Sequence, residues 1–204
     1  MQSIDTTSVC MATYDEEINK YVVKSWTFIP SDTVEDRIKI EKVNYHILKE
    51  QGHCFYSGDR VVNYAEIENF ILGLEDRYGV KIKSFAYDRY NAISTANKIE
   101  AAGYETIEIK QHSSVLSAPI KMLKEAILNS EFAYEKNNLL EIGVGNTREV
   151  LDTNLNYYIS KKKSTGRIDN VMAMLNCFAV FYNEKINNTS IYESDERSEG
   201  FIII

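Results

Sequence analysis

The sequence has few of the residues that define several common classes of protein. Among its 204 residues are only 2 prolines, 9 glycines and 3 cysteines. This composition excludes collagen-like, low-complexity disordered and disulfide-rich chains. Cys10, Cys54 and Cys177 form no C-x-x-C pair, so neither a disulfide framework nor a structural zinc site is indicated. We expect all three to be buried, reduced thiols.

Long apolar runs are missing as well. No stretch approaches the roughly 20 consecutive apolar residues that cross a bilayer, and residues 1–10 have neither the basic nor the apolar segment of a signal peptide. No G-x-x-x-x-G-K-[ST] sequence occurs, which argues against an ATP site of the P-loop type. The sequence therefore predicts a cytoplasmic protein with no membrane contact.

The chain also lacks an excess of basic residues. It has 23 lysines and arginines against 30 aspartates and glutamates, a formal net charge of −7. This balance argues against a protein that binds nucleic acid through bulk positive charge. It does not exclude a metal-dependent nuclease, because each Mg²⁺ or Mn²⁺ ion cancels part of the carboxylate charge around it. The charge close to a site is therefore more informative than the total.

What the sequence does contain is an alternation of strands and helices. β-branched and aromatic residues on both sides of a polar turn predict a hairpin, and apolar residues at helical spacing predict two helices after it. The next segments alternate between strand and helix, which predicts parallel strands with right-handed crossovers. The predicted hairpin covers residues 6–13 and 20–29, the two helices 34–52 and 64–78 with an extended piece at 53–56 between them, and the alternating segments 81–87, 91–102, 104–109 and 118–129.

The last third of the chain is less regular. We expect a short helix within residues 138–152 that is interrupted by Gly143 and Gly145. A strand over residues 157–161 and an amphipathic helix over residues 168–182 follow.

No linker or repeat divides the chain. We therefore predict one α/β domain over residues 1–182, built on a mixed sheet, and a polar tail over residues 183–204. The tail ends in the apolar sequence FIII, residues 201–204, which would pair as an edge strand or dock on a partner.

Two aspartates are candidates for chemistry. Asp88 follows the apolar strand segment SFAY directly, at the carboxyl end of a predicted central parallel strand, where open α/β sheets place their ligands. Asp169 begins the last amphipathic helix. Each aspartate alone is weak evidence, because a favourable position at a helix start also explains it, and for Asp88 helix capping is the stronger explanation from propensity alone. The three histidines show no spacing typical of metal ligands.

A basic segment precedes Asp169. The sequence SKKKSTGR, residues 160–167, contributes Lys161, Lys162, Lys163 and Arg167 and no acidic residue. Such a run is most often a solvated turn. Beside a carboxylate that holds a metal ion, it provides the cations that position backbone phosphates for hydrolysis.

Several of these runs, taken in order, resemble the nuclease domain of tailed-phage large terminase subunits. They are FAYDRYNA at residues 85–92, LSAP at 116–119, and the K-x-K-S-x-x-R-I-D-N that begins at Lys161, followed by Ala173 and Met174. The resemblance covers about residues 5–182. It implies a ribonuclease H-like fold, in which a mixed sheet of an antiparallel hairpin and parallel strands has helices on both faces.

The resemblance also implies a metal-dependent endonuclease that cuts concatemeric viral DNA during genome packaging. Members of this family bind one or two Mg²⁺ or Mn²⁺ ions through three acidic residues, and Asp88 and Asp169 match the second and third. Two alternatives remain for the first. Either Asp5 serves, or Asp5 matches a later aspartate of the family's first strand and the metal ligand lies upstream of Met1.

The same resemblance supplies the DNA contacts and partners. Lys161, Lys163, Arg167 and Arg89 are the expected contacts to DNA phosphates. The substrate would be double-stranded DNA, and the portal and small terminase subunit would be partners through the full-length protein. The family's ATPase motor has no counterpart here, so we expect this chain to be part of a larger or divided protein.

Two other readings stay open. One is another ribonuclease H-like nuclease, such as a junction resolvase or an integrase core. The other is a catalytically incompetent module that docks on DNA or on packaging partners. Metal-dependent cutting separates both nucleases from the module, whereas DNA binding that weakens with salt and leads to no cleavage would favour the module.

Overall fold

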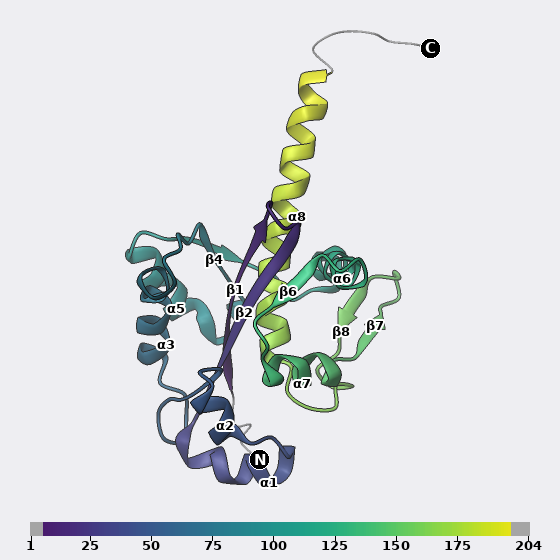
Figure 1. Cartoon of the computed structure of the whole chain (residues 1–204). Helices are drawn as coiled ribbons and strands as arrows, with labels where there is room; N and C mark the ends of the chain where they lie inside the picture. The colour runs from purple at the N-terminus through teal and green to yellow at the C-terminus, as the bar shows by residue number, and fades with distance from the viewer. Residues whose placement is uncertain (1–5, 197–204) are drawn as a thin grey trace.

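A long antiparallel hairpin lies at the centre of the molecule. The computed structural model describes residues 6–196, and in it β1 (Thr7–Asp15) and β2 (Lys20–Ile29) pair along their whole length. The turn between them is held by the Asp15 carboxylate, which accepts the backbone N–H of Glu17 at 3.0 Å. The predicted hairpin is confirmed, and Figure 1 shows it between two groups of helices.

The other edge of β2 carries two short parallel strands. β3 (Cys54–Tyr56) pairs with the end of β2, and β6 (Phe132–Tyr134) pairs with its beginning. The sheet is therefore mixed, as predicted. β6 was not foreseen, because a strand of three residues has too little length to show an alternating pattern.

The next two strands form a separate sheet. β4 (Ser84–Tyr87) and β5 (Glu105–Glu108) are parallel and are joined by α5 (Arg89–Ala101), which confirms the predicted strand–helix–strand unit. The expectation that β4 is a central strand is wrong, because its strand partner among residues 6–196 is β5 alone. β4 instead packs against α8 (Asp169–Glu196), the last helix.

Both helices predicted after the hairpin are broken. Lys42 adopts a left-handed conformation with φ 58°, which separates α1 (Val34–Glu41) from α2 (Tyr45–Glu50). Gly73 similarly separates α3 (Tyr64–Leu72) from α4 (Leu74–Tyr78). In both cases the apolar spacing continues across the break, so the periodicity does not reveal it.

The later helices are longer than predicted. α6 (Ser113–Leu128) begins before residue 118, because the His112 ring nitrogen accepts the N–H of Ser114 at 3.3 Å and caps the helix there. α7 (Asn138–Asn146) continues through Gly143 and Gly145, so the predicted interruption is wrong.

The last part of the chain differs from prediction in two ways. β7 (Glu149–Leu151) pairs with β8 (Tyr157–Ile159) in an antiparallel ribbon whose first strand was not foreseen. α8 begins at the predicted place but continues past Tyr182 to Glu196, and it projects beyond the body of the molecule in Figure 1. The FIII segment lies outside the described residues.

Helices pack on both faces of the hairpin, as the predicted fold class requires. On one face Val23 contacts a cluster from α6 and α8 that includes Leu175 and Phe178. On the other face Trp26 and Phe28 pack against Phe70 of α3. Each such side chain contributes about 1.5–3 kcal/mol when fully buried. Within residues 6–196 no helix is long and apolar enough to cross a membrane.

Candidate metal and DNA site

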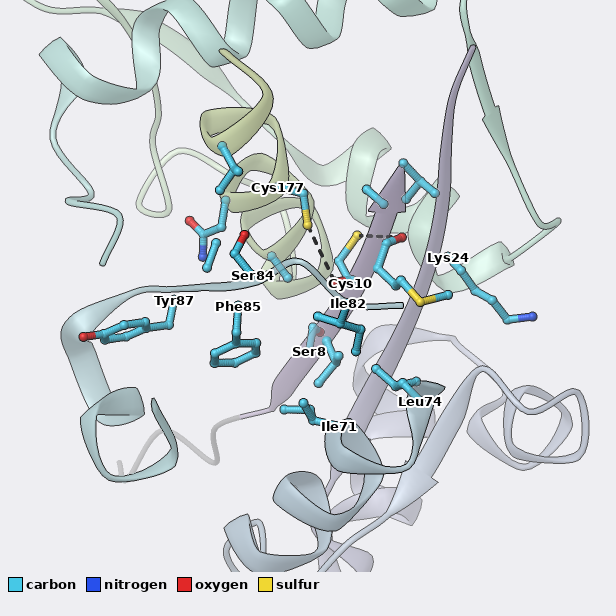
Figure 2. Close-up of a pocket in the computed structure, with 18 of the residues that line it drawn as sticks. Ser8, Cys10, Lys24, Ile71, Leu74, Ile82, Ser84, Phe85, Tyr87 and Cys177 are labelled. Carbon is cyan, nitrogen blue, oxygen red and sulfur yellow. Dashed lines mark hydrogen bonds between the residues drawn. The ribbon is translucent and has the colours of Figure 1, made fainter. Parts of the chain in front are cut away.

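A groove of about 1550 Å³ runs between the hairpin, β4 and α8. Figure 2 shows Ser8 and Cys10 of β1 on one side and Ser84 and Phe85 of β4 on the other, with Cys177 of α8 beside Cys10. The groove exists because β4 does not pair with β1, so side chains rather than backbone hydrogen bonds fill the space between the two strands.

The two aspartates singled out from the sequence both line this groove. Asp88 follows β4 and precedes α5, and Asp169 is the first residue of α8; both line the groove and are half-buried. The two carboxylates come from segments far apart in sequence, and both stand where a helix begins. The positive end of the helix dipole favours negative charge at such positions.

The carboxylate of Asp169 is held in place by two neighbours. Thr6, directly before β1, donates its hydroxyl hydrogen to Oδ2 of Asp169. The Arg167 Nη1 atom lies 4.0 Å from the same oxygen and donates to the Thr6 hydroxyl at 3.1 Å. Thr6 therefore joins Arg167 and Asp169, and fixes the start of β1 against the start of α8.

Glu41, at the end of α1, was missed by sequence reasoning. Its Oε1 accepts the Arg167 Nε–H at 2.9 Å, and its Oε2 accepts the Tyr45 hydroxyl. Burial raises the pKa of Tyr45, and the hydrogen bond to Glu41 raises it further, so the phenol stays protonated. No local pattern could have revealed the pair, because 126 residues separate Glu41 from Arg167.

The predicted DNA contacts occupy different places. Lys161 is exposed and lines the same groove as the two aspartates. Lys163 and Arg89 are also exposed, but they lie outside the lining of the groove. Arg167 lines a smaller hollow of about 410 Å³ on the other side of Asp169. Of the four predicted DNA contacts, Lys161 is thus the one that lines the same groove as the two aspartates.

Two of the predicted metal ligands line the groove. Two aspartate carboxylates in one groove are hard oxygen donors, the ligands that Mg²⁺ and Mn²⁺ prefer. Asp5, the third predicted ligand, lies outside the described residues. Among the side chains that the structure describes, which lie within residues 6–89 and 92–187, no cluster of three or more His, Cys, Asp or Glu is placed to hold a metal ion.

The thiols in the groove do not add to such a site. Cys177 donates to the Cys10 carbonyl at 3.6 Å, and the side-chain hydrogen bond with Cys177, together with burial, raises the pKa of the Cys10 thiol. Protonated thiols are poor ligands. The three cysteines are free, as expected, but only Cys54 is fully buried.

Together, a hairpin extended by parallel strands, helices on both faces and two aspartates at one groove define a nuclease fold of the ribonuclease H-like class. Two solved structures share this fold. The HK97 bacteriophage large terminase matches with a TM-score of 0.78 at 22% identity, over 87% of this chain and 37% of that one. The large terminase nuclease from thermophilic phage G20c matches with a TM-score of 0.54 at 12% identity, over 85% of this chain and 75% of that one.

The sequence comparison identifies the family. The model of the terminase large subunit endonuclease domain matches residues 1–185, and the chain belongs to that family. The large terminase subunit of Enterobacteria phage HK97 is 24% identical over 151 residues, which are 73% of this chain and 29% of that protein. The chain therefore spans under a third of the length of this relative.

Proposed function

We propose that this chain is the metal-dependent endonuclease of a viral packaging terminase and cuts concatemeric DNA. The observation that carries the proposal is that Asp88 and Asp169 line the same groove, in a chain that belongs to the terminase endonuclease family. Family membership favours this activity over a junction resolvase or an integrase core.

Asp88 and Asp169 are the proposed metal ligands, together with Asp5 or an acidic residue upstream of Met1. One or two Mg²⁺ or Mn²⁺ ions would supply activation of the attacking water and neutralisation of charge on the leaving 3′ oxygen. The Thr6 hydroxyl holds the Asp169 carboxylate toward the groove and so limits the orientations it adopts.

The cations around the groove would hold the DNA backbone. Lys161 lines the groove and is placed to contact phosphates next to the scissile bond, whereas Lys163 and Arg89 would contact phosphates further along the duplex. Portal and small terminase subunit are the proposed partners of the full-length protein, which would act in the cytoplasm of the host cell during assembly.

The test is cleavage of plasmid DNA by the purified chain with Mn²⁺ or Mg²⁺, beside an EDTA control. We expect metal-dependent cutting that falls to the EDTA level in Asp88→Asn and in Asp169→Asn. Asp36→Asn is the matched control, because Asp36 is 77% exposed and lies in α1. Retained cutting in either active-site variant would contradict the assignment of that aspartate.

A second candidate function is a module that docks on DNA without cutting it. The two functions differ in the first metal ligand, which is either Asp5, outside the described residues, or an acidic residue upstream of Met1; without that ligand the chain would bind DNA and leave it uncut. Cutting by the wild-type chain excludes this module. Salt-dependent DNA binding without cutting, both in this chain and in one extended upstream of Met1, would establish it.

A further inference from the structure

We propose that Arg167 is a positioning residue for Asp169, anchored by Glu41, and not a phosphate contact. The proposal rests on the nuclease function above, because it concerns the orientation of a proposed metal ligand. It assigns a role to Glu41 and changes the role expected of Arg167.

The first argument for this role is that the Arg167 guanidinium already donates to two protein acceptors. Arg167 Nε donates to Glu41 at 2.9 Å, and Nη1 donates to Thr6 at 3.1 Å. Two donors of the planar group thus point to two fixed protein acceptors, a geometry that arginine offers and lysine does not. A side chain whose role is to contact DNA phosphates is expected to be exposed to solvent, as Lys161 is.

Glu41 is itself fixed in position by two other neighbours, one positively charged and one a hydrogen-bond donor, so it can anchor Arg167. It lies 3.5 Å from Nη1 of Arg37, a residue only 4% exposed, and accepts the Tyr45 hydroxyl. Burial lowers the pKa of Arg37, and the nearby charge of Arg167 lowers it further. Removal of the Glu41 charge would therefore leave two neighbouring guanidinium groups without the anion between them.

Thr6 completes the connection to the groove. Its hydroxyl accepts from Arg167 and donates to Asp169, and the residue is itself buried. The chain of contacts Glu41–Arg167–Thr6–Asp169 therefore joins α1, the loop before α8, the residue before β1 and the start of α8. Supporting contacts of this kind hold a metal ligand in one orientation before the metal or substrate arrives.

The decisive experiment is DNA binding in EDTA over a range of salt concentrations, which does not depend on cleavage. Each phosphate contact that is lost reduces the slope of log K against log salt by about 0.9. We expect Lys161→Gln to reduce the slope by about this amount and Arg167→Gln to leave it unchanged. A reduced slope in Arg167→Gln would overturn the proposal.

Hydrogen exchange of the backbone amides gives an independent readout. We expect Glu41→Gln and Arg167→Gln to speed exchange at the start of β1, and the double variant to add little to either single one, because the two side chains act as a unit. Glu149→Gln is the matched control, since it breaks an ion pair of 2.7 Å with Lys124 elsewhere. Unchanged exchange in Glu41→Gln would contradict the anchoring role.

Cleavage kinetics then test whether the orientation of Asp169 affects the rate of DNA cutting. Glu41→Gln should lower kcat by roughly 10- to 100-fold, since small misplacements of reacting groups have effects of this size, with little change in the KM for DNA. Arg167→Lys should not restore the rate, because lysine lacks the two-donor fork. If neither this chain nor one extended upstream of Met1 cuts DNA, the proposed function fails, and the salt slopes and exchange rates still decide the role of Arg167.

Discussion

At the scale of single residues, Gly143 shows why a glycine inside a helix need not end it. A Cβ at this position would lie 2.1 Å from Oδ1 of Asn170 on the neighbouring helix α8. The Asn170 amide donates to the Leu139 carbonyl at 2.7 Å and is buried. Gly143 therefore allows α7 to approach α8 closely, which explains why the helix passes through it.

This close approach gives a prediction about stability. Gly143→Ala should lower the free energy of unfolding by about 1–3 kcal/mol, the usual effect of overpacking a buried contact. Gly145→Ala is the control, because a Cβ there meets nothing within 4 Å. Urea denaturation of the three proteins measures the difference. Equal stability of Gly143→Ala and the wild type would mean that α7 can move away from α8 with no loss in the free energy of unfolding, which would contradict the prediction.

The same scale shows what sequence reasoning could find at the site. Asp88 and Asp169 were singled out because each stands beside a strong local pattern, a strand for one and an amphipathic helix for the other, and the family resemblance then predicted that they bind metal. Thr6 and Glu41 have no such pattern. Their roles depend on tertiary contacts to residues more than 120 positions away, which only the fold brings together.

At the scale of elements, Asp152 joins the β7–β8 ribbon to α6. Its carboxylate accepts the Ser113 hydroxyl at 2.6 Å and the backbone N–H of Asn156 at 2.9 Å. The hydrogen bond from Ser113, followed by those from the turn, lowers the pKa of Asp152 to about 2. The charged form of this side chain therefore fastens the ribbon to the start of the helix.

The lowered pKa of Asp152 predicts how acid affects the stability that its hydrogen bonds provide between the β7–β8 ribbon and α6. Because the folded-state pKa lies below the unfolded value of about 3.9, the stabilisation is fully present above pH 4 and is lost as the pH falls toward 2. Asp152→Asn should therefore be less stable than wild type at pH 6, with a difference that shrinks between pH 4 and 2. Thermal unfolding across this range measures it, and a constant difference would contradict the role of the charge.

Elements also differ in how well the sequence predicts them. The hairpin and α8 were predicted because they are long enough to repeat their period several times. β6 and β7 have three residues each, too few to show a repeating pattern. β6 pairs with β2, which is distant in the chain, and β7 pairs with β8 across a turn. The break at Lys42 was missed because a left-handed lysine leaves no mark in an apolar pattern.

At the scale of the whole molecule, α8 both fills the core and extends beyond it. Among its residues up to 187, whose burial is described, the last buried one is Ala179, and residues 183–187 are exposed. We therefore predict that removal of residues 188–204 changes the unfolding temperature by less than about 2 °C, since a loss of 1 kcal/mol would shift it by roughly 2–4 °C in a chain of this size. A larger drop would show that the tail belongs to the folded domain.

A matched variant shows what the inner part of the helix contributes. Phe178 is fully buried and contacts Tyr21 and Phe132 of the central sheet. Phe178→Ala should lower the free energy of unfolding by about 3–5 kcal/mol, the usual result of emptying a large core position. Together, the truncation and this variant test the predicted division of the chain near residue 182.

The place of β2 between its partners has a consequence for synthesis on the ribosome. β1 precedes β2 in the chain, so one edge of β2 is covered as soon as the hairpin emerges. The other edge receives β6 only after residues 132–134 are made, and the bond from the Tyr21 N–H to the Glu131 carbonyl waits until then. During that interval the nascent chain presents an unpaired strand edge beside apolar side chains, the feature that most readily recruits chaperones or leads to aggregation.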